Sequence, residues 1–163
     1  MNKYIIGAVV LVAVIIGYSV MSGDENGGST AVTSETSGAK IVVLEQPYDF
    51  GDIEIFAGKV STTYTLKNEG TEDVTITKAG TSCMCTEGEI AGLTFGMHGS
   101  DVDSVTIPAG GEEKVKAIYD PLAHGPSGTG PVTRMLNLET NSTETPKIEL
   151  RFSANVIKTE EST

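Results

Sequence analysis

The segment that decides the fold is Lys147–Ile157, KIELRFSANVI, in which apolar and polar residues alternate. Successive side chains of a β-strand point to opposite faces of a sheet, so alternation with period two predicts a strand with one buried face. The polar positions between the apolar ones predict a second face in contact with water. The residues expected to point into the core are Ile148, Leu150, Phe152, Ala154 and Val156.

The same alternation recurs upstream, between segments that are typical of turns. Val60–Leu66 places Tyr64 and Leu66 on one face, and Glu113–Tyr119 turns Val115, Ala117 and Tyr119 inward. Val132–Thr140 places Leu136 and Leu138 on the face of Val132, and further short strands are expected at Ile41–Leu44, Tyr48–Phe56, Val74–Lys78 and Val105–Ile107. Between these runs lie short segments that contain glycine, proline or asparagine and are typical of turns, at residues 67–70, 108–111 and 143–146.

These elements predict an all-β fold. No stretch after residue 40 spaces its apolar residues as a helix would, over three turns. About seven short strands separated by turns favour an Ig-like antiparallel β-sandwich over residues 41–157. Glu87–Ser104 carries four glycines and is expected to be a long loop or loose hairpin. Residues 158–163 are expected to form a polar tail.

The beginning of the chain carries a membrane signal. Tyr4–Val20 is uncharged and strongly apolar, and its 17 residues reach the short end of the length that spans a bilayer. Lys3 precedes this run and Asp24 follows it, which orients the N-terminus to the cytoplasm. Residues 1–21 are therefore expected to form a single-pass transmembrane helix that anchors the domain outside the cell membrane. Residues 22–40, small and polar, are expected to be a disordered, flexible linker.

A cleaved signal peptide is the alternative interpretation of the first segment. The apolar run is longer than is usual for a signal peptide, and no Ala-x-Ala sequence closes it. Val20-Met21-Ser22 is an acceptable cleavage site, and cleavage there would leave a secreted protein. Under either interpretation the domain lies outside the cytoplasm, where cysteines meet oxidising conditions.

Charge and motifs exclude several classes of function. The net charge is −11, from 22 acidic and 11 basic residues, and it repels nucleic acid. The chain has no Gly-x-Ser-x-Gly motif, and the carboxylates near its turns are expected to be solvated. The sequence therefore favours a protein that is not an enzyme, and the expected partner is another protein at the cell surface or in the periplasm.

Thr81–Thr86, TSCMCT, holds both cysteines of the chain. Three interpretations remain open. A disulfide between Cys83 and Cys85 would close a small, strained ring of the kind used in catalysis or regulation. The cysteines could instead be free thiols packed at one end of the sandwich. The third interpretation is a soft-metal site, because two thiolates with methionine and histidine neighbours suit copper(I) or zinc.

The metal hypothesis names its ligands from a short inventory. The chain has two histidines, His98 and His124, both in glycine-rich segments, and Met97 directly precedes one of them. The loop after Cys85 and the loop before Val132 can approach the same end of a sandwich. The candidate ligands for copper or zinc are therefore Cys83, Cys85, Met97, His98 and His124.

The chain resembles a bacterial family of exported domains of unknown function, related to the ASH (ASPM, SPD-2, hydin) and MSP-type immunoglobulin-like modules. Five segments carry the resemblance: YDFG from Tyr48, TYTLKNEGTEDVTI from Thr63, TSCMCT from Thr81, IPAGGEEKVKAIYDP from Ile107 and LETN from Leu138. It covers about residues 41–157 and implies an Ig-like sandwich without a general activity. The family's Ser-Cys-Gly-Cys-Thr motif falls on Ser82–Thr86, with Met84 where glycine is typical.

Three functions follow from the sequence. The first is a membrane-anchored, extracytoplasmic Ig-like module that binds a protein partner or serves a structural role without being an enzyme. The second is a copper- or zinc-binding protein that uses the Cys-Met-Cys motif with loop histidine and methionine residues. The third is a thiol–disulfide redox protein that uses Cys83 and Cys85 alone.

Overall fold

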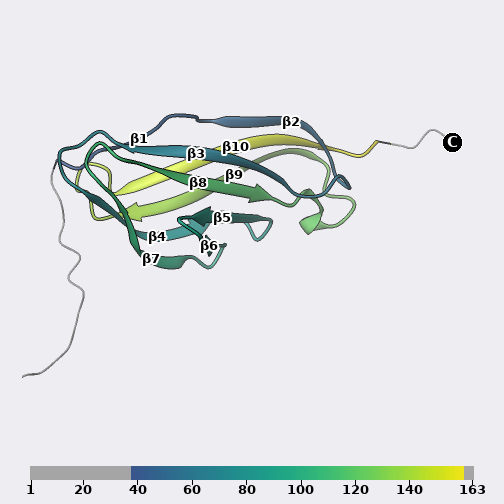
Figure 1. Cartoon of the computed structure of the whole chain (residues 1–163). Coiled ribbons are helices and arrows are strands. Elements are labelled where there is room, and N and C mark those ends of the chain that lie inside the picture. Colours follow the sequence, from purple (N-terminus) through teal and green to yellow (C-terminus); the bar gives the residue numbers. More distant parts are fainter. Residues whose placement is uncertain (1–37, 160–163) are drawn as a thin grey trace, which may run out of the picture. The chain divides into compact units, whose positions relative to one another are not determined.

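The computed structural model of the chain describes residues 38–159, and these residues form an all-β fold (Figure 1). Ten strands and one short 3-10 helix, η1 (Pro121–His124), make up the described part. The strands are β1 (Ile41–Val43), β2 (Tyr48–Glu54), β3 (Val60–Asn68), β4 (Val74–Thr81), β5 (Thr86–Ile90), β6 (Leu93–Phe95), β7 (Ser100–Ile107), β8 (Glu112–Tyr119), β9 (Gly130–Thr140) and β10 (Lys147–Ile157).

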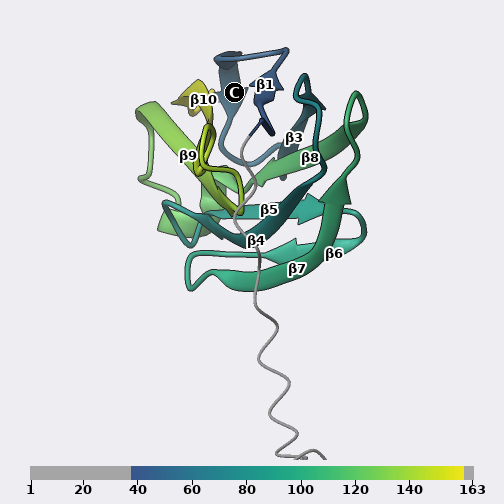
Figure 2. The same cartoon turned by 90° about the vertical axis from the view of Figure 1, so that its left-hand side faces the viewer.

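The strands form two five-stranded sheets. The first has the order β1-β3-β8-β5-β6, and the second has the order β2-β10-β9-β4-β7. Every pair is antiparallel except β2 with β10, which is parallel. Seen along the strands in Figure 2, β3 and β8 lie across from β9 and β10. The predicted all-β sandwich is therefore confirmed.

The core forms where the alternating strands turn their apolar faces toward each other. All five inward residues predicted for β10 are buried, and Phe152 and Leu150 are fully inaccessible to solvent. From the opposite sheet, the Tyr119 ring lies with its centroid 5.6 Å from that of Phe152. Phe50 of β2 packs edge-on against the same ring at 5.5 Å. Burial of each large side chain stabilises the fold by about 1.5–3 kcal/mol.

The segment expected to be a long loop or loose hairpin, Glu87–Ser104, forms the antiparallel hairpin β5–β6 and the start of β7. The hairpin alternative is therefore correct and the long loop is not, and Gly88 shows why the hairpin is well packed. This glycine lies buried opposite Phe95, and a Cβ atom at this position would come within 2.1 Å of the Phe95 ring. Gly88, a residue type that is unfavourable in isolated strands, is required here by the packing of Phe95. The described residues contain ten strands, whereas the sequence predicted about seven.

The first two strands of the domain belong to different sheets. β1 pairs with β3 in the first sheet, and β2, after Pro47, pairs with β10 in the second. The last residues of the predicted linker contact the sandwich, because Ala39 is fully buried and Gly38 accepts a hydrogen bond from the Thr71 amide.

The predicted anchor, residues 1–21, and most of the predicted linker lie outside the described residues. Within residues 38–159, no helix has both the length and the apolar character needed to cross a bilayer.

Replacement of Gly88 by alanine is expected to destabilise the domain. The added methyl group would collide with the Phe95 ring, and overpacking of this kind costs about 1–3 kcal/mol. Gly96→Ala is the matched control, since a Cβ at Gly96 would meet no atom within 4 Å. Urea unfolding of the two variants measures the difference. Equal midpoints for Gly88→Ala and Gly96→Ala would contradict this packing role.

Tyr64 should make the domain sensitive to strong alkali. Its side chain is buried and its hydroxyl donates a hydrogen bond to the Arg151 carbonyl at 2.9 Å. Burial, with a smaller effect of Tyr48, raises the pKa of Tyr64 to about 12. In the unfolded chain the Tyr64 hydroxyl loses its proton at about pH 10. The neutral hydroxyl therefore stabilises the fold fully below about pH 10, and this contribution is lost as pH rises toward 12.

Tyr64→Phe should be less stable than wild type at pH 8, because the hydrogen bond is lost, by about 1 kcal/mol. Between pH 10 and pH 12 its free energy of unfolding should decline less steeply than that of wild type. Urea titrations at pH 8, 10 and 11 measure both effects. Parallel declines in the two proteins would show that Tyr64 does not carry the alkaline sensitivity.

Candidate functional site

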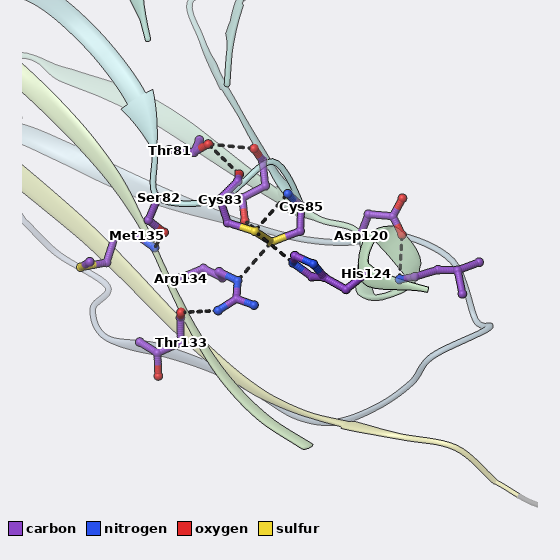
Figure 3. Close-up of a disulfide and its surroundings, with 11 residues drawn as sticks. Thr81, Ser82, Cys83, Cys85, Asp120, His124, Thr133, Arg134 and Met135 are labelled. Carbon is purple, nitrogen blue, oxygen red and sulfur yellow. Dashed lines mark hydrogen bonds between the residues drawn. A yellow bond between two sulfur atoms is a disulfide. The ribbon is translucent and has the colours of Figure 1, made fainter. Parts of the chain in front are cut away.

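The two cysteines lie in the connection where the chain leaves the second sheet at β4 and enters the first at β5. Thr81 fixes this connection, because its hydroxyl donates to the carbonyls of Cys83 and Thr86, each at 3.0 Å. Ser82 ties it to β9 through its amide, which donates to the Met135 carbonyl at 2.9 Å, and its hydroxyl, which accepts from the Met135 amide at 3.0 Å. The cysteines are therefore held by strands of both sheets (Figure 3).

Cys83 and Cys85 form a disulfide with each other. The two sulfurs have different surroundings. Cys85 belongs to the hydrophobic core and is 2% exposed, whereas Cys83 is half-buried at its edge. Met84 between them is 71% exposed and points out of the turn. Of the three interpretations of the cysteines, the structure has the disulfide.

The disulfide closes a loop of only three residues, since its cysteines are two positions apart. A cross-link stabilises a fold mainly by restricting the unfolded chain, and this effect grows with loop length. In that treatment a three-residue loop contributes about 1.6 kcal/mol, against about 3 kcal/mol for a 15-residue loop. This disulfide therefore contributes less to the free energy of unfolding than a disulfide that closes a longer loop.

Each sulfur has its own nitrogen neighbour. The His124 Nε2 atom lies 3.3 Å from the Cys83 Sγ atom, and Arg134 Nε donates to the Cys85 Sγ atom at 3.1 Å. The Cys85 amide also donates to Cys83 Sγ at 3.2 Å, and the Thr86 hydroxyl lies 3.7 Å from Cys85 Sγ. Figure 3 shows the histidine and arginine reaching the disulfide from different segments.

The helix η1 places His124 beside Cys83. Asp120 caps this helix by accepting a hydrogen bond from the Leu122 amide at 2.9 Å. The Asp120 amide in turn donates to the Cys85 carbonyl at 2.9 Å, so the helix starts directly against the cysteine turn. His124, in the last turn of η1, thereby reaches the sulfur although 41 positions separate it from Cys83.

Arg134 is a site residue that the sequence reasoning missed. It lies on the same face of β9 as the buried Leu136 and Leu138, and it is only partly exposed. Its Nη1 donates to the Thr133 carbonyl at 2.9 Å, and its guanidinium carbon lies 5.9 Å from the centroid of the Tyr119 ring. The signal in the sequence was a charged residue at an inward position of an alternating strand, which normally has a specific buried partner.

Tyr119 lies beneath this arginine and is almost fully buried. Its removal from water raises the pKa of Tyr119, and the nearby Arg134 charge opposes that rise in part. The phenol is therefore neutral at ordinary pH and serves as an uncharged support for the guanidinium.

Only part of the predicted metal-ligand set comes together. Cys83, Cys85 and His124 have ligand atoms that all lie within 4.8 Å of one another. Met97 and His98 line a separate pocket of about 260 Å³, together with residues of β4 and β9, and neither cysteine lines that pocket. Both of these side chains are exposed.

Comparison with solved structures shows the fold. A protein of unknown function from Porphyromonas gingivalis W83 has a TM-score of 0.58 and 12% sequence identity, over 79% of this chain and 51% of that chain. The chain thus spans about half the length of the P. gingivalis protein.

Two further matches are weaker. The human CEP192 ASH/PapD-like domain 7 has a TM-score of 0.41 and 14% identity, over 78% of this chain and 89% of that chain. The secreted serine protease VesC from Vibrio cholerae has a TM-score of 0.48 and 13% identity, over 73% of this chain and 23% of that chain.

Sequence comparison reaches one family. No curated protein is similar to the chain. The model of one family, described as protein of unknown function (DUF1573), matches residues 41–156, which include all ten strands except the last residue of β10. The resemblance noted in the sequence is thereby confirmed, and the chain belongs to the DUF1573 family of proteins of unknown function.

Proposed function

We propose that this chain is a non-enzymatic, Ig-like module that binds a partner protein outside the cytoplasm, with residues 1–21 as its membrane anchor. The surface that carries the proposal is one end of the sandwich, called here the turn end. It consists of residues 55–59, 82–85 and 120–125. Val60 and Thr86 both pair with Tyr119, so the connections before them and after it leave the first sheet at the same end.

The turn end gathers exposed apolar side chains on well-fixed backbone. Met84 is 71% exposed, Phe56 55% and Leu122 42%. The backbone around Met84 is held by the disulfide and by the hydrogen bonds of Thr81 and Ser82. Binding surfaces commonly combine exposed apolar anchors with a rigid support, because little conformational entropy is lost when a partner binds.

The edges of the two sheets are less suited to a partner. β1 and β6 have three residues each. β2 has an irregular register opposite Ser153 and Asn155, beside Gly51 with φ of +66°, and β7 has one opposite Ile76 and Lys78. Short strands and bulges are the usual ways in which proteins prevent strand addition at an edge. This favours the turn end over the edges as the binding surface.

The location outside the cytoplasm is supported by the apolar run at Tyr4–Val20 and by the oxidised cysteines. Disulfides persist in exported proteins and are rare in the cytosol, where reducing systems keep thiols free.

A photo-crosslinking amino acid at position 84 tests the binding surface. In cells that carry the partner, the substitution Met84→p-benzoylphenylalanine should give a discrete adduct of higher mass upon irradiation. The same substitution at Leu93, an exposed apolar residue of β6 away from the turn end, is the matched control and should give none. Absence of an adduct at position 84, or equal adducts at both positions, would remove the turn end as the binding surface.

Copper or zinc binding is a second candidate function, favoured by one observation. Two sulfurs and an imidazole lie within 4.8 Å of one another, and this donor set suits Cu(I) and Zn²⁺. Thiolates rather than a disulfide are the ligands, so the site requires reduced cysteines. Only three of the five sequence-predicted ligands belong to this cluster, and Met97 and His98 belong to the separate pocket.

Metal titration of the reduced protein tests this candidate. After reduction with a phosphine under argon, the chain should bind about one equivalent of Cu(I) in competition with a chromogenic chelator. The double variant Cys83→Ser/Cys85→Ser should bind none. His124→Ala should weaken binding by at least about tenfold, as removal of supporting partners already does at metal sites.

His98→Ala is the matched histidine control and should leave the affinity unchanged. Equal effects of the two histidine substitutions would contradict the three-residue site, and failure of the reduced wild type to compete with the chelator would remove metal binding altogether.

A further inference from the structure

We propose that the Cys83–Cys85 disulfide exchanges with thiols of a partner polypeptide, with Cys83 as the sulfur that is attacked and Cys85 as the sulfur that leaves. This stoichiometric exchange, which consumes the chain's own disulfide and is not a catalytic cycle, goes beyond the binding role and does not depend on it. The chemistry needs only the two sulfurs and their immediate neighbours. Its substrate class is a pair of cysteine thiols close enough to form a disulfide.

Access to the two sulfurs is unequal. Cys85 is 2% exposed and packs in the core, whereas Cys83 lies half-buried beside the exposed Met84. Thiol–disulfide exchange requires the attacking thiolate to approach a sulfur atom directly, so accessibility selects the sulfur that reacts. An external thiol can therefore reach Cys83 and is kept from Cys85.

Charge is distributed just as unequally. The Arg134 guanidinium donates through Nε to Cys85 Sγ at 3.1 Å. Arg134 takes part in neither of the two salt bridges formed by the described side chains. A positive charge beside a sulfur stabilises its thiolate, and a stabilised thiolate leaves faster in exchange. Arg134 thus favours Cys85 as the leaving group.

Arg134 is fixed where this role requires it. Its Nη1 donates to the Thr133 carbonyl at 2.9 Å, and its guanidinium carbon lies 5.9 Å from the Tyr119 ring centroid. These contacts hold the guanidinium in place, and neither a carbonyl nor an aromatic ring carries a charge that would neutralise it. The Thr86 hydroxyl lies 3.7 Å from Cys85 Sγ, and a ring nitrogen of His124 lies within 4.8 Å of both sulfurs.

His124 lies on the side from which a thiol would approach. It is exposed, and its Nε2 atom is 3.3 Å from Cys83 Sγ. In its neutral form the imidazole can accept the proton of an incoming thiol and so produce the attacking thiolate beside the sulfur. The two side chains therefore have different roles. His124 accepts the proton of the thiol that attacks Cys83, and Arg134 stabilises the thiolate of Cys85, which leaves.

The reaction balances in two steps. The first partner thiol gives its proton to His124, and its sulfur forms a bond to Cys83 Sγ while the Cys83–Cys85 bond breaks and Cys85 leaves as a thiolate. The second partner thiol loses its proton to water, and its sulfur attacks the first partner sulfur in the mixed disulfide and releases Cys83 as a thiolate. The partner dithiol is oxidised by two electrons, and the two cysteines of this chain are reduced by two.

Trapping variants of the full chain test the assignment of the two sulfurs. Cys85→Ser leaves the Cys83 thiol and Cys83→Ser leaves the Cys85 thiol, and the chain has no other cysteine. With 5,5′-dithiobis(2-nitrobenzoate) as the probe, Cys85→Ser should react at least about tenfold faster than Cys83→Ser, because only its thiol is accessible. In 8 M urea the two variants should react at similar rates, which excludes an intrinsic difference.

The role of Arg134 is tested in the wild-type disulfide. The equilibrium between oxidised and reduced chain is measured in glutathione redox buffers by alkylation and mass spectrometry. Arg134→Gln should lower the equilibrium constant for reduction at least about tenfold, equal to about 30 mV in potential. Arg134→Lys should restore part of the loss. Arg151→Gln, which removes an exposed guanidinium from the neighbouring strand β10, is the matched control and should change little.

Three outcomes would overturn the proposal. They are a disulfide that glutathione does not reduce in the folded chain, a Cys83→Ser variant that reacts as fast as Cys85→Ser, and an Arg134→Gln shift no larger than that of Arg151→Gln. These assays use small thiols and disulfides and no partner protein. A negative photo-crosslinking result at Met84 would therefore leave the exchange chemistry standing, and a failure of exchange would leave the binding surface standing.

Discussion

The packing of Tyr119 joins the fold to the candidate site. This residue ends β8, pairs with both Val60 and Thr86 in the first sheet, and lies against Phe152 of the second sheet with ring centroids 5.6 Å apart. The same ring lies under the Arg134 guanidinium. Asp120, the next residue, begins the helix that carries His124. One buried aromatic residue therefore contacts the opposite sheet, supports Arg134 and directly precedes the helix that carries His124.

Much of the fold was predictable because burial on one face imposes a period of two. The inward residues of β3, β8 and β10 followed from that rule. Glycine, proline and asparagine indicated the turns that follow β3 and β7. The strands β5 and β6 were not predicted as strands, because a glycine such as Gly88 can have two opposite effects on a strand. Its lack of a side chain weakens a strand in isolation, yet here it leaves the space that the Phe95 ring fills. Only the partner strand distinguishes these effects.

The site was predictable in composition and only partly in arrangement. Cys83 and Cys85 are conspicuous by their spacing, but His98 and His124 look alike in the sequence. Their difference comes from topology, because β8 pairs with β5 and delivers the following helix to the cysteines, whereas the β6–β7 connection delivers His98 to a separate pocket. Arg134 was visible as a charge at an inward position, but nothing local identifies a sulfur as its partner.

The three proposals for this site, partner binding, metal binding and thiol–disulfide exchange, differ in whether the two cysteines are oxidised or reduced. The oxidised pair holds Met84 outward on a fixed turn, which suits a binding surface. The reduced pair offers two thiolates beside an imidazole, which suits a soft metal ion. Thiol–disulfide exchange converts the oxidised pair into the reduced pair. The Arg134 charge that favours the Cys85 thiolate therefore also favours the form that can bind metal.

A metal ion bound to the reduced cysteines would prevent their exchange, because a coordinated sulfur is no longer free to attack or to be attacked. In an oxidising compartment the disulfide is the resting state. The oxidised form therefore carries the proposed binding surface, and the proposed metal site requires a partner that reduces the disulfide.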